Sequence, residues 1–247
     1  MKNNHLLKNL LATLFWVAIW HILALWWNHF LLLPTPLQVL KRLLVLMGSL
    51  EFWHITAVSI GRIVLGTVCA IVLGIALAIV CTASPVADGL VSPVMSTIQA
   101  APVASFAILV QLWINRDFVP VLICGMMILP VVWSNVCTGI RQTDRQLLEM
   151  AKVYRLSRPQ ILRRIYIPSV LPYFQAACSS ALGLGWKAGI AAEVLTVPGL
   201  SIGRMIAESK LYILTEDLFA WTVVVVLLSL LLQKMTLKIL NGRNRHG

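Results

Sequence analysis

Lys187, Glu193 and Gln99 are polar side chains inside long apolar stretches of this 247-residue chain. A charged group inside an apolar helix costs about 2.5 to 3.5 kcal/mol on insertion scales, so it is seldom retained without a partner or a watery cavity. Lys187 can bind an anionic solute, pair with another helix or extend toward lipid headgroups, and these alternatives remain open. Glu193 is not its partner along one helix face, because the intervening helix rotates the two side chains by about 240°. For Gln99, lining of a pore and hydrogen bonding between helices are both open.

The cysteines and histidines form no pattern that supports catalysis or metal binding. Each cysteine stands alone in or at the end of an apolar stretch, with no Cys-x-x-Cys pair and no neighbouring histidine. An enzyme needs a nucleophile, a base or a metal set at one place, and the scattered residues supply none. We therefore expect no catalytic residue and no metal site on this chain.

A basic segment, residues 141–168, separates two apolar stretches. Thr143-x-x-Gln146 and Ser157-x-x-Gln160 are typical of helix starts, because the hydroxyl accepts from a first-turn amide while the Gln reaches back. They predict two short helices with a break near residues 155–156. The apolar residues of each helix fall on one face: Leu147, Leu148, Ala151 and Tyr154 in the first, and Ile161, Leu162, Ile165 and Tyr166 in the second. By charge alone, a basic connector on the cytoplasmic side explains the segment equally well.

The composition indicates an integral membrane protein, since 59% of residues are hydrophobic, 12% are charged and mean hydropathy is +0.87. We expect an all-α, polytopic fold in one transmembrane domain, 1–247, with spans near 9–32, 57–81, 90–114, 118–139, 170–193 and 218–240. Lys and Arg concentrate in the basic segment and at the chain ends, which predicts that both termini are cytoplasmic. The net charge of +11 is dispersed along membrane-flanking loops, which favours contact with anionic lipid and not with nucleic acid.

The basic segment contains Glu149-Met150-Ala151, then Arg155, then Ile165-Tyr166-Ile167-Pro168. This pattern resembles the "EAA" loop of bacterial ABC importer permeases. That pattern has Ala, Gly and Leu where this chain has Met150, Arg155 and Ile167. The resemblance implies that 141–168 is a coupling loop that docks into an ATP-binding subunit. The residues it places in that role are Glu149, Met150, Ala151, Tyr154, Arg155, Leu156, Ile165 and Pro168.

Residues 183–195, 198–203 and 211–220 resemble the permease subgroup for nitrate, aliphatic sulfonates and taurine, with thiamine-precursor importers close by. The resemblance implies the permease subunit of an ATP-driven importer in a bacterial inner membrane. Its solute would be a small anion of the sulfonate, taurine or nitrate class. The alternatives are a thiamine-precursor pyrimidine and, outside this class, a structural subunit of another membrane complex.

The resemblance also implies partners. They are two copies of an ATP-binding subunit, an extracytoplasmic substrate-binding protein and a second permease, most simply a copy of this chain. ATP and Mg would be used by the ATP-binding subunit, because this chain has no Gly-x-x-x-x-Gly-Lys-Ser/Thr loop and we expect it to bind no cofactor. Gln99, Lys187 and Glu193 become the candidates for the translocation pathway. The spacing Gly185-x-x-x-Gly189 predicts close helix packing.

Two further stretches are predicted to lie outside. Residues 36–50 have an amphipathic pattern that is typical of a helix along the membrane surface. Residues 202–210 are predicted to form a short helix in the loop before the last span, where Glu216 and Asp217 favour a helix start.

Overall fold

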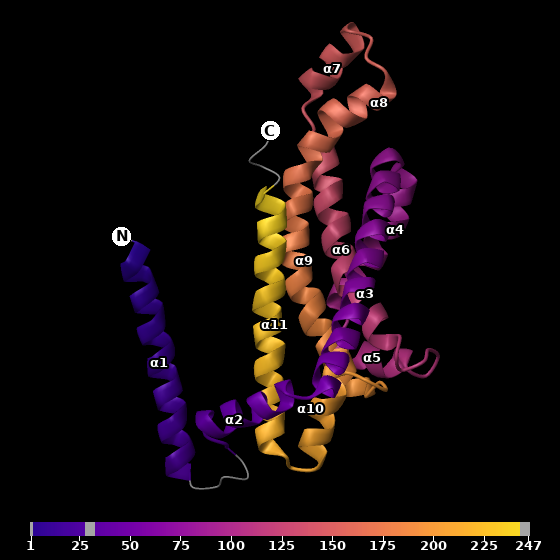
Figure 1. Cartoon of the computed structure of the whole chain (residues 1–247). Helices are drawn as coiled ribbons and strands as arrows, with labels where there is room; N and C mark the ends of the chain where they lie inside the picture. The colour runs from indigo at the N-terminus through magenta and orange to yellow at the C-terminus, as the bar shows by residue number, and fades with distance from the viewer. Residues whose placement is uncertain (1, 28–32, 243–247) are drawn as a thin grey trace.

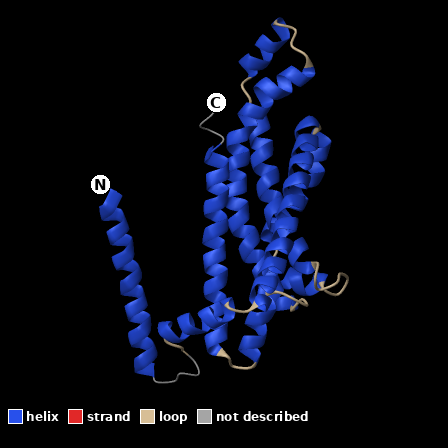
Figure 2. Ribbon diagram, in the orientation of Figure 1, coloured by secondary structure: helices blue, strands red, loops and turns tan. Residues whose placement is uncertain are grey.

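A computed structural model describes residues 2–27 and 33–242, and every regular element in these residues is a helix (Figure 2). The predicted all-α fold is confirmed. Residues 28–32, which the first predicted span includes, lie outside the described residues. The helices that match the predicted spans are α1 (Lys2–Trp27), α3 (Leu50–Ala83), α4 (Pro85–Ala100) with α5 (Val103–Val110), α6 (Val119–Arg141), α9 (Ile167–Thr196) and α11 (Thr215–Gly242).

Helices α3, α6, α9 and α11 run alongside one another and form a bundle (Figure 1). The short helices α7 (Arg145–Val153) and α8 (Arg158–Ile161) project beyond one end of it, which we call the loop end. Helices α2 (Pro36–Met47) and α10 (Ile202–Leu211) lie at the opposite end, which we call the α10 end. Helix α1 starts and α11 finishes toward the loop end (Figure 1).

Small residues let the bundle helices approach closely. A Cβ atom added at Gly66 of α3 would lie 2.4 Å from the Val121 carbonyl oxygen of α6. A Cβ at Gly185 of α9 would lie 2.4 Å from Cδ1 of Ile128 in α6, and one at Gly189 would lie 2.8 Å from Cγ1 of Ile63 in α3. Both glycines of the Gly185-x-x-x-Gly189 pattern therefore lie at helix contacts of α9. Gly185 lies against α6, and Gly189 lies against α3.

The stretch 90–114, predicted as one span, is not a continuous helix. Helices α4 and α5 are bent by 103° at a break around Ala101 and Pro102. Ala101 is extended (φ −70°, ψ 131°), as expected for the residue before a proline, and Pro102 has no amide hydrogen to continue the helical ladder. Helix α5 then packs Ala107 and Val110 against α6 and α9.

By length and composition, three of the described helices can cross a membrane, or four if α4 and α5 count as one span. They are Leu50–Ala83, Val119–Arg141 and Thr215–Met235. Helix α9 has 30 residues but is not apolar enough to be counted with these three. In α1, the apolar part described is the shorter stretch Leu11–Trp26. Six crossings stay a prediction.

The predicted outer helices are both present, as α2 and α10. A capping box between Thr35 and Gln38 starts α2, and Pro36 fits the first helical position. Arg42 of α2 donates to both carboxylate oxygens of Asp217 in the first turn of α11, with Nη2 and Oδ2 3.0 Å apart. This hydrogen-bonded contact with the Asp217 carboxylate raises the pKa of the Arg42 guanidinium. It ties α2 across the α10 end of the bundle.

Candidate functional site

The basic segment forms two short helices, as its pattern predicts. Ser157 and Gln160 form the predicted capping box, and the Gln160 Oε1 atom accepts from the Ser157 amide at 2.8 Å. The predicted start at Thr143 is wrong, because Asp144 caps α7 and its Oδ1 accepts from the Gln146 amide at 2.8 Å. The Thr143 hydroxyl is buried and donates to the Gly139 carbonyl, so it is already used at the end of α6.

Helix α7 ends at the predicted break. Arg155 has a left-handed backbone (φ 50°). Its amide donates to the Lys152 carbonyl at 3.0 Å, and the Leu156 amide donates to the Ala151 carbonyl at 2.9 Å. These two bonds define a Schellman motif, whose left-handed position is usually glycine. Arg155 therefore occupies a glycine-type position, and a side chain there costs roughly 1 to 2 kcal/mol.

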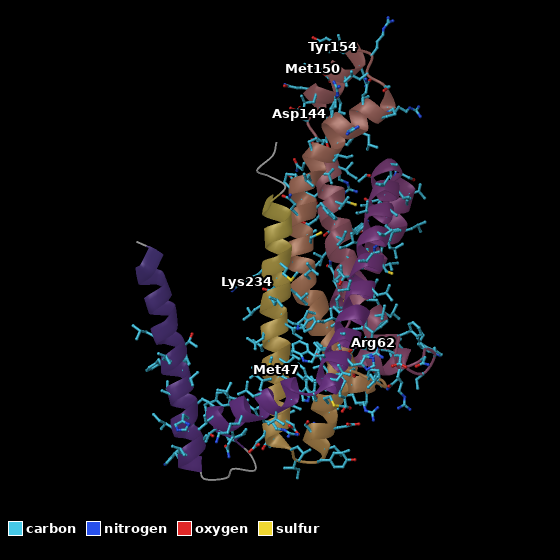
Figure 3. The ribbon with its side chains drawn as sticks, viewed as in Figure 1. Met47, Arg62, Asp144, Met150, Tyr154 and Lys234 are labelled. Atoms are coloured by element: carbon cyan, nitrogen blue, oxygen red, sulfur yellow. The ribbon has the colours of Figure 1, made fainter. Side chains whose placement is uncertain are left out.

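Apolar side chains line both the inside and the outside of this hairpin. Ala151 and Ile165 are buried, while Met150, Val153 and Tyr154 are 53%, 80% and 72% exposed. Met150 and Tyr154 lie at the far end of the hairpin (Figure 3). Two further predicted loop residues, Glu149 and Pro168, are also exposed. An exposed apolar patch with a charged rim marks a surface that binds another molecule. Other large apolar side chains exposed in residues 141–168 are Leu147, Leu162 and Ile167.

The hairpin is joined to the bundle through a helical connection. After α8 the chain makes one π-helical turn, Leu162–Tyr166, in which the Ile167 amide donates to the Leu162 carbonyl, and it continues directly into α9. Pro168 lies in the first turn of α9, where its missing amide hydrogen is tolerated. At the base, Arg141 of α6 pairs with Asp88 of α4 at 2.8 Å. The hairpin is therefore joined to α9 by continuous helix and to the end of α6 by a short connection.

The three polar candidates inside the apolar stretches are placed differently. Lys187 is exposed on α9 and Gln99 is exposed near the end of α4, just before the bend. Glu193 is fully buried and contacts α3 and α10. No hydrogen bond or ion pair described for residues 2–27 and 33–242 joins any two of them. The pathway assignment stays a prediction for all three.

The sequence did not reveal the residues that surround Glu193. Ser59 and Arg62 of α3 and Asp117 in the α5–α6 connection form hydrogen bonds or ion pairs around it. Arg62 lies inside α3, and its side chain is 14% exposed (Figure 3). The available signal was an arginine with apolar residues on both sides, which is the pattern of a charge that has a buried partner.

A cavity lies at the loop end. It has a volume of about 530 Å³ and an apolar lining from α3, α6 and the first turns of α9, including Ile75, Val136 and Phe174. None of Gln99, Lys187 and Glu193 lines it. The cavity therefore offers apolar contact but no polar group from the predicted pathway.

Comparison with known proteins agrees with this architecture. The family described as "Binding-protein-dependent transport system inner membrane component" matches residues 70–242. The chain therefore belongs to this family of transporter permease subunits, which are not enzymes. It is a membrane-spanning permease subunit of an ABC importer, as the loop motif predicted.

Two relatives illustrate the range of the family. The chain is 25% identical to the taurine transport system permease protein TauC of Escherichia coli K12, over 86% of this chain and 82% of TauC. It is 28% identical to the formylaminopyrimidine transport permease protein ThiX of Halalkalibacterium halodurans, over 68% of this chain and 67% of ThiX.

A solved structure shares the fold. The crystal structure of an amino acid ABC transporter with histidines matches with a TM-score of 0.59 and 14% identity, over 85% of this chain and 98% of that chain.

Proposed function

We propose that the chain, paired with a second copy of itself, forms the pathway of an importer for a small anion. Relatives are named as permeases for taurine, aliphatic sulfonates and nitrate, and these solutes are anionic or carry an acid group. Lys187 is an exposed cation within a predicted span and has no ion pair among the described residues. An anionic solute in an apolar environment needs a positive counter-charge, and a lysine at that depth can supply it.

The single observation that carries the coupling proposal is the exposed apolar patch of the hairpin, with Met150 and Tyr154 at 53% and 72% exposure. In this proposal the patch docks on an ATP-binding subunit, one for each of two permease copies, and that subunit uses ATP and Mg. The loop end then faces the cytoplasm of a bacterial cell, together with both termini. A substrate-binding protein delivers the solute at the α10 end.

Tyr154 and Tyr212 offer a matched test of docking. Both follow the last residue of a short helix, both precede a left-handed residue, and they are 72% and 68% exposed at opposite ends of the molecule. Tyr154→Asp should reduce copurification of the ATP-binding subunit about tenfold, because a charge replaces apolar contact area in the docking surface. Tyr212→Asp should leave copurification unchanged. Equal recovery of the subunit with both variants would contradict docking through the hairpin.

The solute is tested by reconstitution of the permease with its ATP-binding subunit and binding protein in vesicles. Taurine, an alkanesulfonate or nitrate should stimulate ATP hydrolysis and uptake. Lys187→Met should preserve assembly and basal hydrolysis while uptake falls about tenfold, and Lys187→Arg should retain part of it. Lys234→Met, which removes an exposed charge on α11 away from the α10 end, is the control. Stimulation by formylaminopyrimidine alone, with normal uptake by Lys187→Met, would favour the pyrimidine alternative.

A further inference from the structure

Glu193 is a buried acidic residue at the point where three helices meet. Its side chain is 0% exposed. The Oε2 atom accepts hydrogen bonds from the Ser59 hydroxyl of α3 at 2.9 Å and from the Gly203 amide of α10 at 3.1 Å. The Oε1 atom lies 3.6 Å from Nη1 of Arg62. Ser59 and Gly203 therefore donate to Oε2, whereas Oε1 has the Arg62 guanidinium at ion-pair distance and no hydrogen-bond donor among the described residues.

The start of α10 depends on these partners. The first amides of a helix have no acceptor within the helix, so another group must accept from them. The Ile202 amide donates to the Ser59 hydroxyl at 2.9 Å, and the Gly203 amide donates to Glu193. The Ser59 hydroxyl thus accepts from α10 while it donates to Glu193. A carboxylate at this position is also favoured by the dipole of α10.

Helix α10 rests directly on the backbone of α9 at this residue. A Cβ atom added at Gly203 would lie 2.2 Å from the Glu193 Cβ and 2.5 Å from the Glu193 carbonyl carbon. Real Cβ atoms do not approach so closely, so only glycine allows this contact. The hydrogen bond and the close approach involve the same pair of residues, which fixes α10 both in direction and in distance.

Arg62 extends the same network to two connecting segments. Its Nη2 atom lies 2.6 Å from Oδ1 of Asp117, and its Nη1 atom donates to the Leu200 carbonyl at 2.5 Å. Asp117 Oδ1 also accepts from the Gly199 amide at 3.1 Å. The segments before α6 and before α10 are therefore held to α3 by one guanidinium, whose fork suits several acceptors at once.

Helix α9 connects this network to the hairpin without a break. Its 30 residues span about 45 Å, from the π-helical turn at the loop end to the last turn that carries Glu193. We propose that Glu193 is a positioning residue that couples α10 to α9, so that displacement of the hairpin during the ATPase cycle moves α10 at the opposite end. This role rests on the proposed function, in which the binding protein delivers the solute at the α10 end.

The coupling is tested with vesicles that contain the permease, the ATP-binding subunit and the binding protein. Glu193→Ala removes both acceptor atoms, and the ratio of ligand-stimulated to basal ATP hydrolysis should fall about tenfold while basal hydrolysis stays unchanged. Glu193→Gln keeps one oxygen for the Gly203 amide, so it should retain most of the stimulation. Glu51→Gln, an exposed acidic residue at the start of α3, is the control and should behave as the unchanged protein.

Ser59→Ala keeps the proposal falsifiable if Glu193→Ala does not assemble. It removes the hydroxyl between Ile202 and Glu193 but leaves the carboxylate with Gly203 and Arg62. Its stimulation ratio should fall about threefold, since one link of the network is lost. Full stimulation in Ser59→Ala, or in an assembled Glu193→Ala, would overturn the coupling.

Hydrogen exchange of the purified permease separates this proposal from the proposed function, because it needs no transport. The amides of α10 should exchange at least about tenfold faster in Glu193→Ala than in the unchanged protein, while Glu51→Gln should leave them unchanged. Unchanged exchange in α10 would overturn the positioning role even if transport is observed. Faster exchange in α10 supports the positioning role even if no solute stimulates ATP hydrolysis. A lack of stimulation by any solute would count against the importer proposal and not against the positioning role.

Discussion

Helices α7 and α10 lie at opposite ends of the molecule and end in the same way. After α7 the chain reads Tyr154-Arg155-Leu156, and after α10 it reads Tyr212-Ile213-Leu214. The middle residue is left-handed in both, with φ of 50° and 57°. The amide that follows bonds back to the Ala151 carbonyl at 2.9 Å in one case and to the Ser209 carbonyl at 2.8 Å in the other. Both helices thus stop in a Schellman motif without glycine.

The two helices begin differently. Helix α7 is capped by Asp144, an exposed residue that bonds only within the hairpin. Helix α10 is capped by Ser201, which is 0% exposed, and two of its first amides bond to Ser59 and Glu193 of other helices. A local cap leaves a helix free to move with a docked partner, whereas a cap shared with other helices makes it follow them. We infer that the loop end receives displacement and the α10 end follows it.

The first prediction tests the close contact of α10 with α9. Gly203→Ala should destabilise the permease by about 1 to 3 kcal/mol, because the new methyl group overlaps the Glu193 backbone and something must shift. Gly61→Ala in α3 is the matched control, since a Cβ there meets nothing within 4 Å, and it should stabilise by about 0.5 to 1 kcal/mol. Thermal unfolding of the purified proteins in detergent measures both. An equal response would mean that α10 is not held against α9.

The second prediction compares the two caps. Ser201→Ala should cost about 1 to 2 kcal/mol, because the Arg204 amide loses its acceptor in a buried setting. Asp144→Ala should cost about 0.5 to 1 kcal/mol, because water replaces the carboxylate at the exposed start of α7. Hydrogen exchange resolved by helix should show faster exchange in α10 and in α7 respectively. A larger loss in Asp144→Ala would reverse the contrast between a fixed and a free helix.

Local features of the fold were predictable because they depend on neighbours in the sequence. The start at Ser157, the break at Arg155 and the outer helix near 202–210 followed from capping and turn patterns, and the structure has all three. The predicted helix start at Thr143 was wrong because the Thr143 hydroxyl donates to the Gly139 carbonyl of α6. The Thr143-x-x-Gln146 spacing gives no sign of this hydrogen bond. The stretch 90–114 is one span by hydropathy, and the proline at 102, which interrupts it in the sequence, is where the structure bends by 103°.

Contacts between distant segments were not predictable in the same way. The rotation of the helix excludes Glu193 as an ion-pair partner of Lys187. It does not show which helix lies against Glu193. Ser59 and Glu193 lie far apart in the sequence, and only the packing of α3 against α9 brings them to 2.9 Å. Periodicity reports which face of a helix is apolar, not which residues a buried charge meets. The network at the α10 end therefore required the structure.

The third prediction uses the left-handed residues that follow α7 and α10, and it has the smallest effect. Arg155→Gly and Ile213→Gly each relieve about 1 to 2 kcal/mol of backbone strain but add about 0.4 to 1 kcal/mol of chain entropy to the unfolded state, so each should stabilise by up to about 1 kcal/mol. Thermal unfolding should show a gain that is at least as large for Ile213→Gly, because a β-branched residue tolerates positive φ least. Copurification of the ATP-binding subunit should be unchanged in Ile213→Gly. If Arg155 contributes its charge to docking, Arg155→Gly will unfold at a higher temperature yet bind the subunit less tightly. A loss of thermal stability in Arg155→Gly would show instead that its side chain holds the hairpin together, and the two helix ends would then no longer be equivalent.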